Sequence, residues 1–293
     1  MKRLLTRYRG YTHALSVVLP AGTAMLAFAI NSILCRMALG EKVVDAASFS
    51  SIRLLSGAAM LACMLLWRKH GSGHASINPV STLMLFIYAI CFSFSYLHLT
   101  AGTGALILFG AVQLTMILYG LARGARHGAQ VWVGLLAAFA GLVYLLLPGI
   151  RTPPLAGAML MAVAGVAWGV YSIRGRNAED AISCTAWNFI GTVPLALLTW
   201  LVFHADIHLT TEGVALAIAS GALASALGYI IWYSVLPRLT PTSAASIQLS
   251  VPVIAAIGGV VLLAEPITFR LATASFVVLG GIYLTIRPAR TGA

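Results

Sequence analysis

Residues 239–253 read LTPTSAASIQLSVPV and lie within a run of 26 residues, Leu239 to Ala264, that carries no charged side chain. A helix of about 20 residues crosses the hydrocarbon core of a bilayer, so the run is long enough to be a membrane span. It nevertheless contains Pro252, which has no N–H to donate to the carbonyl of Gln248. A carbonyl without its helical partner is tolerated at membrane depth only where it faces protein or a water-filled cavity. The stretch therefore predicts a span that opens into the interior of a helical bundle.

The composition of the whole chain predicts an integral membrane protein. Apolar residues make up 60% of the 293 residues and charged residues only 9%, against roughly 25% charged in soluble domains. The net charge of +11 does not indicate a nucleic-acid partner, because the basic residues fall between apolar runs and build no soluble basic face. The N-terminal MKRLLTRYRGYTH precedes a long apolar run without a cleavage site of small residues, so we expect a retained first span.

Charges and turn residues divide the chain into ten apolar segments of membrane-spanning length. We therefore expect an all-α integral membrane protein whose partners are the lipid bilayer and a small-molecule substrate, functional as a monomer. The predicted spans are residues 15–38, 46–67, 80–98, 101–122, 130–147, 154–174, 182–203, 213–236, 241–263 and 268–286.

The distribution of Lys and Arg between the loops predicts the orientation. With a cytoplasmic N-terminus, the inner segments hold thirteen Lys and Arg residues and the outer segments hold four. Both termini are then cytoplasmic, and we expect a multi-pass protein of a bacterial inner membrane.

The two halves of the sequence resemble each other. A shift of 140 places residues 99–148 on 239–288 without a gap, and AINSILCR (29–36) lies on AWGVYSIR (167–174) at a shift of 138. Each half, 1–149 and 150–293, has five predicted spans, an odd number, so the second half enters the membrane from the opposite side. The sequence therefore predicts an inverted repeat of two five-helix halves, a construction found in many secondary transporters.

These features resemble the EamA family of the drug/metabolite transporter superfamily. The resemblance covers about residues 15–286, and its most specific parts are AWGVYSIRGR and LTPTSAASIQLSVPVIAAIGGVVLLAEPIT, which ends in the Glu-Pro of the family. The first half departs from the pattern, because Ala125 in GARHGA replaces an acidic residue and AIN (29–31) replaces Trp-Gly. The resemblance implies ten spans and a transport activity, and bacterial exporters of aromatic and other amino acids are closest in size and layout.

Polar side chains in the predicted span 241–263 are the first candidates for substrate binding. Thr242, Ser246 and Ser250 recur every four residues and form a stripe, while Gln248 points elsewhere. Small polar residues also serve as contacts between membrane helices, which is an equally good explanation of the serines. We predict substrate-binding roles for Gln248 and Ser250.

Aromatic and amide side chains of other spans complete the predicted site. Trp168 either packs in the core or stacks on a substrate, and Tyr96 and His98 stand where the third span ends in a Gly-rich turn. Uncharged amides inside the spans need hydrogen-bond partners and are expected to face protein or a cavity. The predicted substrate-binding residues are Trp168, Gln248, Tyr96, His98, Asn31, Gln113, Asn188 and Ser250.

Arg53 is the strong charge that falls clearly within a predicted span. An unpaired cation at the centre of a membrane helix costs roughly 2.5–3.5 kcal/mol on insertion scales. We expect its long side chain to snorkel outward to Asp45 or Glu41. The alternative is that Arg53 faces the cavity and binds a carboxylate.

The absence of certain residue types from the predicted spans limits the possible energy sources and chemistry. No Asp or Glu falls within a predicted span, which disfavours strong proton coupling, and no GxxxxGK[ST] loop is present for ATP. The four cysteines lie in apolar segments and form no CxxC pair, so no cofactor, metal site or catalytic residue is predicted. We therefore predict a secondary exporter of small amphipathic metabolites, such as aromatic and other amino acids, that works by alternating access. A multidrug or nucleotide-sugar transporter of the same fold, a channel and, remotely, a membrane-embedded enzyme are the alternatives.

Overall fold

A computed structural model describes the chain over residues 2–68, 76–123, 128–147, 153–176, 178–239, 244, 247, 248 and 250–286, with backbone only for 2–16 and 285–286. Over these ranges the protein is helical, and the extended pairing within them is an isolated antiparallel bridge between Val44 and Leu209. Thr240, Thr242, Ser246 and Ala125, which the sequence analysis singled out, lie outside the described residues.

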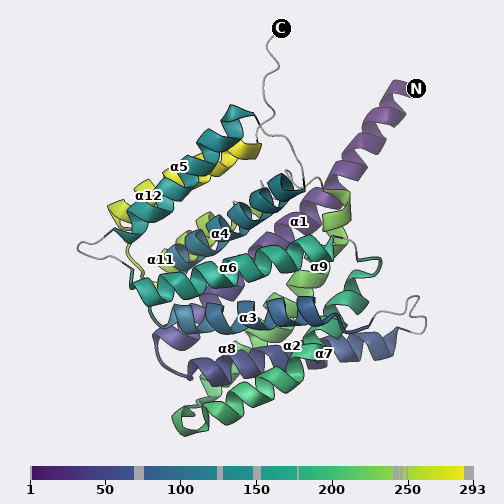
Figure 1. Cartoon of the computed structure of the whole chain (residues 1–293). Helices are drawn as coiled ribbons and strands as arrows, with labels where there is room; N and C mark the ends of the chain where they lie inside the picture. Colours follow the sequence, from purple (N-terminus) through teal and green to yellow (C-terminus); the bar gives the residue numbers. More distant parts are fainter. Residues whose placement is uncertain are drawn as a thin grey trace.

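The described helices follow one another with short connections (Figure 1). Eight of the helical segments are long and apolar enough to cross a membrane, and two shorter apolar helices follow, Ser250–Leu263 and Phe269–Leu284. The predicted all-helical membrane architecture is thereby confirmed. The elements are α1 (Lys2–Gly40), α2 (Ala46–Trp67), α3 (Pro79–Tyr96), α4 (Ala101–Ala122), α5 (Ala129–Leu146), α6 (Leu155–Gly175), α7 (Ala181–Val202), the 3-10 turn η1 (His204–Asp206), α8 (Thr211–Ile218), the π-helix η2 (Ala219–Leu227), α9 (Gly228–Val235), the 3-10 turn η3 (Leu236–Arg238), α11 (Ser250–Leu263) and α12 (Phe269–Ile286).

Short polar residues fix where several helices begin. Asp45, Asn78 and Thr100 each accept a hydrogen bond from the backbone N–H three residues further on, at the starts of α2, α3 and α4. Thr210 caps α8 in the same manner, and Asp180 caps α7 by accepting from the N–H of Ile182, two residues further on. Each cap satisfies an N–H group that the first helical turn leaves unpaired.

Polar contacts tie the helices together at two opposite ends of the bundle. At one end, Arg36 near the end of α1 forms an ion pair with Glu265 after α11 (2.9 Å). At the other, Arg68 after α2 pairs with Asp180 before α7 (2.8 Å). We call these the Arg36 end and the Arg68 end. Because α1 finishes at the Arg36 end and α6 finishes at the Arg68 end, where Arg174 bonds to Asn78, α1 and α6 run in opposite directions.

The helices form a central group flanked by two helix pairs. In Figure 1, α5 and α12 pack against each other along one edge, and α2 and α7 lie at the opposite edge. Between them, α3 packs on α6, α4 packs on α6 and α11, and α1 packs on α9 and α11. The α5–α12 pair therefore lies at the periphery of the bundle.

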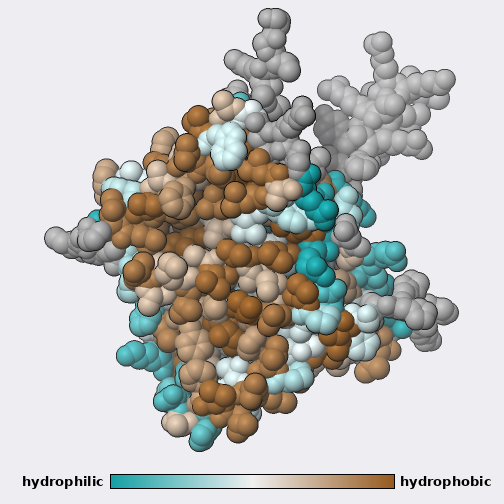
Figure 2. Space-filling model, viewed as in Figure 1, coloured by the Kyte–Doolittle hydropathy of each residue, from teal (hydrophilic) through white to brown (hydrophobic). Residues whose placement is uncertain are grey.

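The surface of the bundle is suited to lipid. Figure 2 shows apolar side chains across the middle of the visible face, with hydrophilic residues gathered toward the sides where helices end. Large apolar side chains such as Phe139, Leu201, Val261 and Phe276 are exposed. An exposed apolar area of this extent on a helical bundle indicates contact with a bilayer.

Two glycines that the 140-residue shift superposes make matching contacts. A Cβ on Gly141 of α5 would lie 2.8 Å from Val278 of α12, and a Cβ on Gly281 of α12 would lie 2.6 Å from the backbone N of Ala138 in α5. The shift carries residue 141 onto 281 and residue 138 onto 278, so each contact maps onto the other. Gln130 at the start of α5 also donates to the carbonyl of Leu284, and Arg270 at the start of α12 donates to that of Leu147. The two helices are therefore antiparallel and held by reciprocal contacts.

Gly281→Ala is expected to destabilise the protein, while Gly280→Ala one position earlier is not. The added methyl at residue 281 meets backbone atoms of α5, whereas a Cβ on Gly280 has nothing within 4 Å. Overpacking of this kind costs about 1–3 kcal/mol. Thermal unfolding of both variants in detergent tests the expectation, and equal melting temperatures would contradict the close α5–α12 contact.

Candidate substrate site

Arg53 lies in the interior of the bundle and does not reach the bundle end. Its side chain is 1% exposed, so the expectation that it snorkels to Asp45 or Glu41 is wrong. The Asp45 carboxylate instead accepts from the backbone N–H groups of Ser48 and His208. Arg53 can remain buried because its position on α2 faces polar groups of three neighbouring segments, whereas snorkelling is needed where a residue faces lipid.

Three neutral side chains hold the Arg53 guanidinium. Nε donates to Ser225 Oγ (3.1 Å), and Nη2 donates to the hydroxyls of Tyr88 (3.2 Å) and Tyr229 (3.1 Å). The guanidinium carbon also lies 4.9 Å from the ring centroid of Phe92 and 5.2 Å from that of Tyr88, within the range of cation–π attraction.

The tyrosines that hold Arg53 belong to a set of rings in mutual contact, here called the aromatic cluster. Trp168 of α6 lies 5.1 Å from Tyr88 and 4.6 Å from Tyr229, measured between ring centroids. Phe28 of α1 meets Trp168 edge-on at 5.4 Å. The central rings of the cluster are Phe28, Tyr88, Phe92, Trp168, Tyr171, Phe189, Tyr229 and Trp232, and Tyr96 and Tyr233 border it at Phe92 and Tyr171.

A chain of polar groups lies beside the cluster. Asn31 of α1 donates to the Tyr88 hydroxyl (3.4 Å) and accepts from Ser220 Oγ (2.6 Å). The structure thus brings together two predicted site residues, Asn31 and Trp168, around Arg53. Their surroundings combine flat apolar rings with hydrogen-bonding groups, as expected for binding a molecule that is part apolar and part polar.

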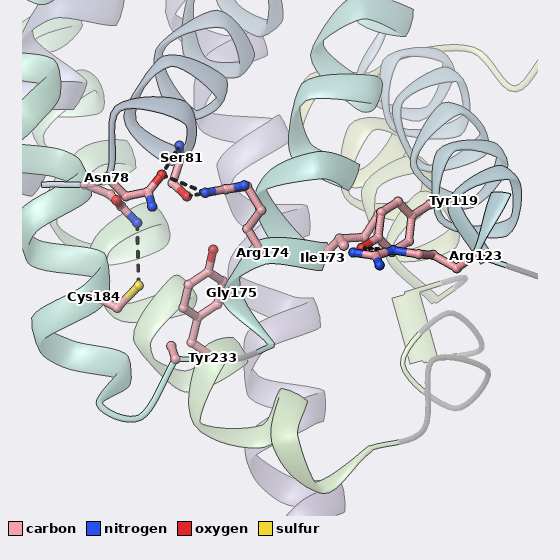
Figure 3. A pocket seen from close by; sticks show the side chains of 11 residues that line it. Asn78, Ser81, Tyr119, Arg123, Ile173, Arg174, Gly175, Cys184 and Tyr233 are labelled. Carbon is pink, nitrogen blue, oxygen red and sulfur yellow. Dashed lines mark hydrogen bonds between the residues drawn. The ribbon is translucent and has the colours of Figure 1, made fainter.

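A pocket of about 410 Å³ lies at the Arg68 end of the bundle, between α3, α4, α6, α7 and α9. Figure 3 shows Arg174 reaching from α6 to Asn78 and Ser81, and Arg123 beside Tyr119 on the other side of the pocket. The predicted residue Asn188 lines this pocket and donates to Cys184 Sγ (3.7 Å). Two arginines therefore give the pocket a positive rim.

Aromatic rings connect the pocket to the buried Arg53. Tyr233 lines the pocket, and its ring lies 5.3 Å from that of Tyr171. Tyr171 in turn lies 5.5 Å from Trp168 and 6.4 Å from Tyr229, which bonds to Arg53. The pocket and the aromatic cluster are therefore joined by direct ring contacts through Tyr233 and Tyr171.

Of the remaining predicted site residues, Tyr96 borders the aromatic cluster, with its ring 4.8 Å from that of Phe92, and the others lie elsewhere. His98 lines a second pocket, of about 240 Å³, at the Arg36 end. Tyr96 and Gln113 are fully buried, Tyr96 with its hydroxyl near the carbonyl of Ala101 (3.4 Å). Gln248 is buried and donates to the carbonyl of Ala244 in its own helix (3.3 Å), whereas Ser250 is exposed and donates to that of Ile247. The structure does not gather all eight residues in one place.

Sequence reasoning missed several residues around the aromatic cluster. Tyr88, Tyr229 and Ser225 hold Arg53, but a tyrosine or serine inside an apolar segment carries no distinctive pattern. The signal that was present is Arg53 itself, because a charge inside a span requires polar neighbours on other helices.

Comparison with known proteins places the chain in a family. The sequence model of the EamA-like transporter family matches residues 155–287. An uncharacterized protein of Pseudomonas aeruginosa is 50% identical over 275 residues, which are 92% of this chain and 96% of the relative. The chain belongs to the EamA-like transporter family.

Two more distant similarities agree with this assignment. A Salmonella typhimurium protein named as a probable amino-acid metabolite efflux pump is 24% identical over 215 residues, 68% of this chain and 72% of the relative. A solved crystal structure superposes with a TM-score of 0.66 at 19% identity, covering 92% of this chain and 98% of that one, which shows a shared fold. This EamA-like protein is therefore a multi-pass membrane transporter, since its family and the names of its relatives indicate transport rather than catalysis.

Asp180→Asn is expected to remove a pH-dependent contribution to the stability of the transporter. Partial burial raises the pKa of Asp180, but hydrogen bonds from Ser183, Arg68 and the Ile182 backbone outweigh it, so the pKa lies below its usual value. A lowered pKa in the folded state means that the stabilisation is complete above about pH 4 and is lost as the pH falls further. The wild type should melt at a higher temperature than Asp180→Asn at neutral pH, and the difference should shrink as the pH is lowered. The exposed Asp206→Asn is the control, and an unchanged gap at low pH would contradict the assignment.

Proposed function

We propose that the protein exports small amphipathic metabolites, amino acids including aromatic ones, by alternating access around the aromatic cluster. The observation that carries the proposal is the cluster itself, in which Trp168, Tyr88 and Tyr229 surround polar groups deep between two tied bundle ends. Aromatic rings stack on apolar side chains, and amide and hydroxyl groups suit the amino and carboxyl groups of a zwitterion.

The predicted inverted repeat, with halves 1–149 and 150–293, is part of this proposal. In the repeat, α1 corresponds to α6, α3 to α9 and α4 to α11. The α3–α6 contact then corresponds to the α9–α1 contact, and the α4–α6 contact to the α11–α1 contact. All four contacts occur in the structure. The reciprocal glycine contacts of α5 and α12 and the opposite directions of α1 and α6 support the same relation. Rocking of two such halves exposes a central site to each side in turn.

The repeat also relates the two arginines that close the bundle ends. The shift of 138 superposes Arg36 on Arg174. Arg36 bonds to Glu265 and to the carbonyl of Tyr96 at one end, and Arg174 bonds to Ser81 and Asn78 at the other. In the proposed cycle, the contacts of Arg36 break while those of Arg174 are kept, and the reverse occurs in the other half of the cycle.

The proposal includes an orientation in the membrane and a working unit. The Arg68 end carries Arg68, Arg123, Arg174 and Arg238, so the positive-inside rule places it in the cytoplasm. We assign both termini to the cytoplasmic side of a bacterial inner membrane and the monomer as the working unit. The name of the Salmonella relative supports amino-acid metabolites as the substrate class.

Trp168→Phe is expected to weaken substrate affinity about two- to tenfold, because an aromatic contact contributes roughly 0.5–1.5 kcal/mol beyond its buried area. Phenylalanine retains a ring in the cluster and limits the loss of packing. The measurement is uptake of labelled phenylalanine, threonine and methionine into proteoliposomes, with the lipid-exposed Trp132→Phe as the control. A linear flux without saturation would indicate a channel, and saturable uptake that is equal in both variants would remove Trp168 from the site.

Glu265→Gln is expected to slow alkylation of Cys184, which lines the pocket at the Arg68 end. Loss of the Arg36–Glu265 ion pair favours opening at the Arg36 end, and alternating access then closes the Arg68 end. The rate of reaction with N-ethylmaleimide in a Cys35→Ala, Cys63→Ala, Cys91→Ala background measures the shift. Glu212→Gln at the exposed start of α8 is the control. Faster alkylation in Glu265→Gln would show that the two ends open together.

A further inference from the structure

We propose that Arg53 recognises the carboxylate of the transported molecule, an inference that rests on the proposed function and narrows its substrate class to compounds with a carboxylate and an apolar body. The partners of Arg53 in the structure are hydroxyl groups and aromatic rings. Among the described residues, the ion pairs are Arg36–Glu265 and Arg68–Asp180, both at bundle ends. The positive charge of Arg53 is thus held by neutral groups.

One nitrogen of the guanidinium remains available. Arg53 Nη1 is buried and has no hydrogen-bond partner among the described residues. A charged donor that is buried without a partner has lost its hydration free energy. A carboxylate compensates this cost best, because it accepts the hydrogen bond and carries the opposite charge. The Arg guanidinium is planar and always protonated, so it binds a carboxylate through fixed N–H directions.

The backbone around Arg53 is built to bring a polar side chain to it. The π-helix η2 carries Ser225 and packs directly on α2, where a Cβ on Gly221 would clash with the carbonyl oxygen of Arg53. π-helical turns occur in many proteins at functional sites. Here the wide turn places Ser225 Oγ at Nε, which leaves Nη1 for another partner.

The neighbours of Arg53 define the rest of the ligand. Trp168 lies against Tyr88 and Tyr229, the two rings whose hydroxyls bond to Arg53, and its Nε1 also has no partner among the described residues. A ligand carboxylate at Nη1 would therefore place its apolar part beside flat rings. The positive rim of the pocket formed by Arg123 and Arg174 attracts the same negative group from solvent.

Matched pairs of compounds test this assignment on the full-length protein in detergent. The probes are phenylpropionate against phenylpropionamide, and phenylalanine against phenylalaninamide at a pH low enough to keep both amino groups protonated, so that each pair differs in the carboxylate alone. Affinity is read from ligand-induced thermal stabilisation. The wild type should bind each acid about 10- to 100-fold more tightly than its amide, the range for a hydrogen bond to a charged group.

Variants of Arg53 separate recognition from folding. Arg53→Gln should reduce the preference for acids to less than about threefold, while Arg53→Lys should keep the preference at lower affinity, because it keeps the charge without the planar fork. Arg238→Gln, an exposed arginine of η3, is the matched control and should behave as the wild type. If Arg53→Gln does not fold, an acid affinity in Arg53→Lys equal to that of the wild type overturns the proposal.

The remaining outcomes are distinguishable. Equal binding of acids and amides by the wild type, stabilisation by chloride alone as strong as by phenylpropionate, or no stabilisation by either acid each overturns the carboxylate site. Saturable uptake of the amides into proteoliposomes would do so while the carrier function stands. Acid binding that depends on Arg53 without saturable flux of any probe would instead overturn the proposed function and leave the carboxylate site in place.

Discussion

The structure depends on how a bundle with an apolar exterior holds a guanidinium in its interior. A buried cation loses its hydration, and an attractive contact repays this only when geometry and further hydrogen bonds are favourable. At Arg53 the compensation comes from Ser225, Tyr88 and Tyr229, which belong to three different segments. Hydrogen bonds to Arg53 therefore hold α3, η2 and α9 against α2. The aromatic cluster is built around the two tyrosines that supply the hydroxyl groups.

The two bundle ends are closed by related residues with unlike partners. Arg36 pairs with the carboxylate of Glu265, whereas Arg174 bonds to the neutral side chains of Asn78 and Ser81. Both arginines are charged donors, but Arg36 alone of the two also gains the attraction of an opposite charge on its partner. The Arg68 end therefore has the weaker interhelical tie at its repeat-related arginine, and the larger of the two pockets lies there. In the first half of the sequence, the acid that would complete the symmetry is replaced by Ala125, which lies outside the described residues.

The helical architecture could be predicted because lipid imposes simple rules on sequence. Length and hydropathy placed the helices, and Asp45, Asn78 and Asp180 stand at helix starts where caps are expected. The superposition of Gly141 on Gly281 was visible as a sequence match, and the structure shows both at the same helix contact. The resemblance to the EamA family was also strongest in the second half, where the family match lies.

The site was harder to predict, because it depends on which face each helix turns inward. Asn31 and Trp168 both contact Tyr88 near Arg53, but His98 and Asn188 lie at opposite ends, and Ser250 is exposed. Hydropathy in an apolar helix does not distinguish a face toward lipid from a face toward protein. For Arg53 the cost of an unpaired charge was recognised, yet the sequence did not show that two tyrosines and a serine from distant segments would hold it.

The central claim is that one internal site is exposed to the two sides of the membrane in turn. Counterflow measures this directly, with proteoliposomes loaded with unlabelled phenylalanine and diluted into a trace of labelled phenylalanine. The account predicts a transient accumulation of label above equilibrium, because the unlabelled compound occupies the returning site and delays exit of the label. A monotonic approach to equilibrium, with a rate independent of the internal load, would contradict it.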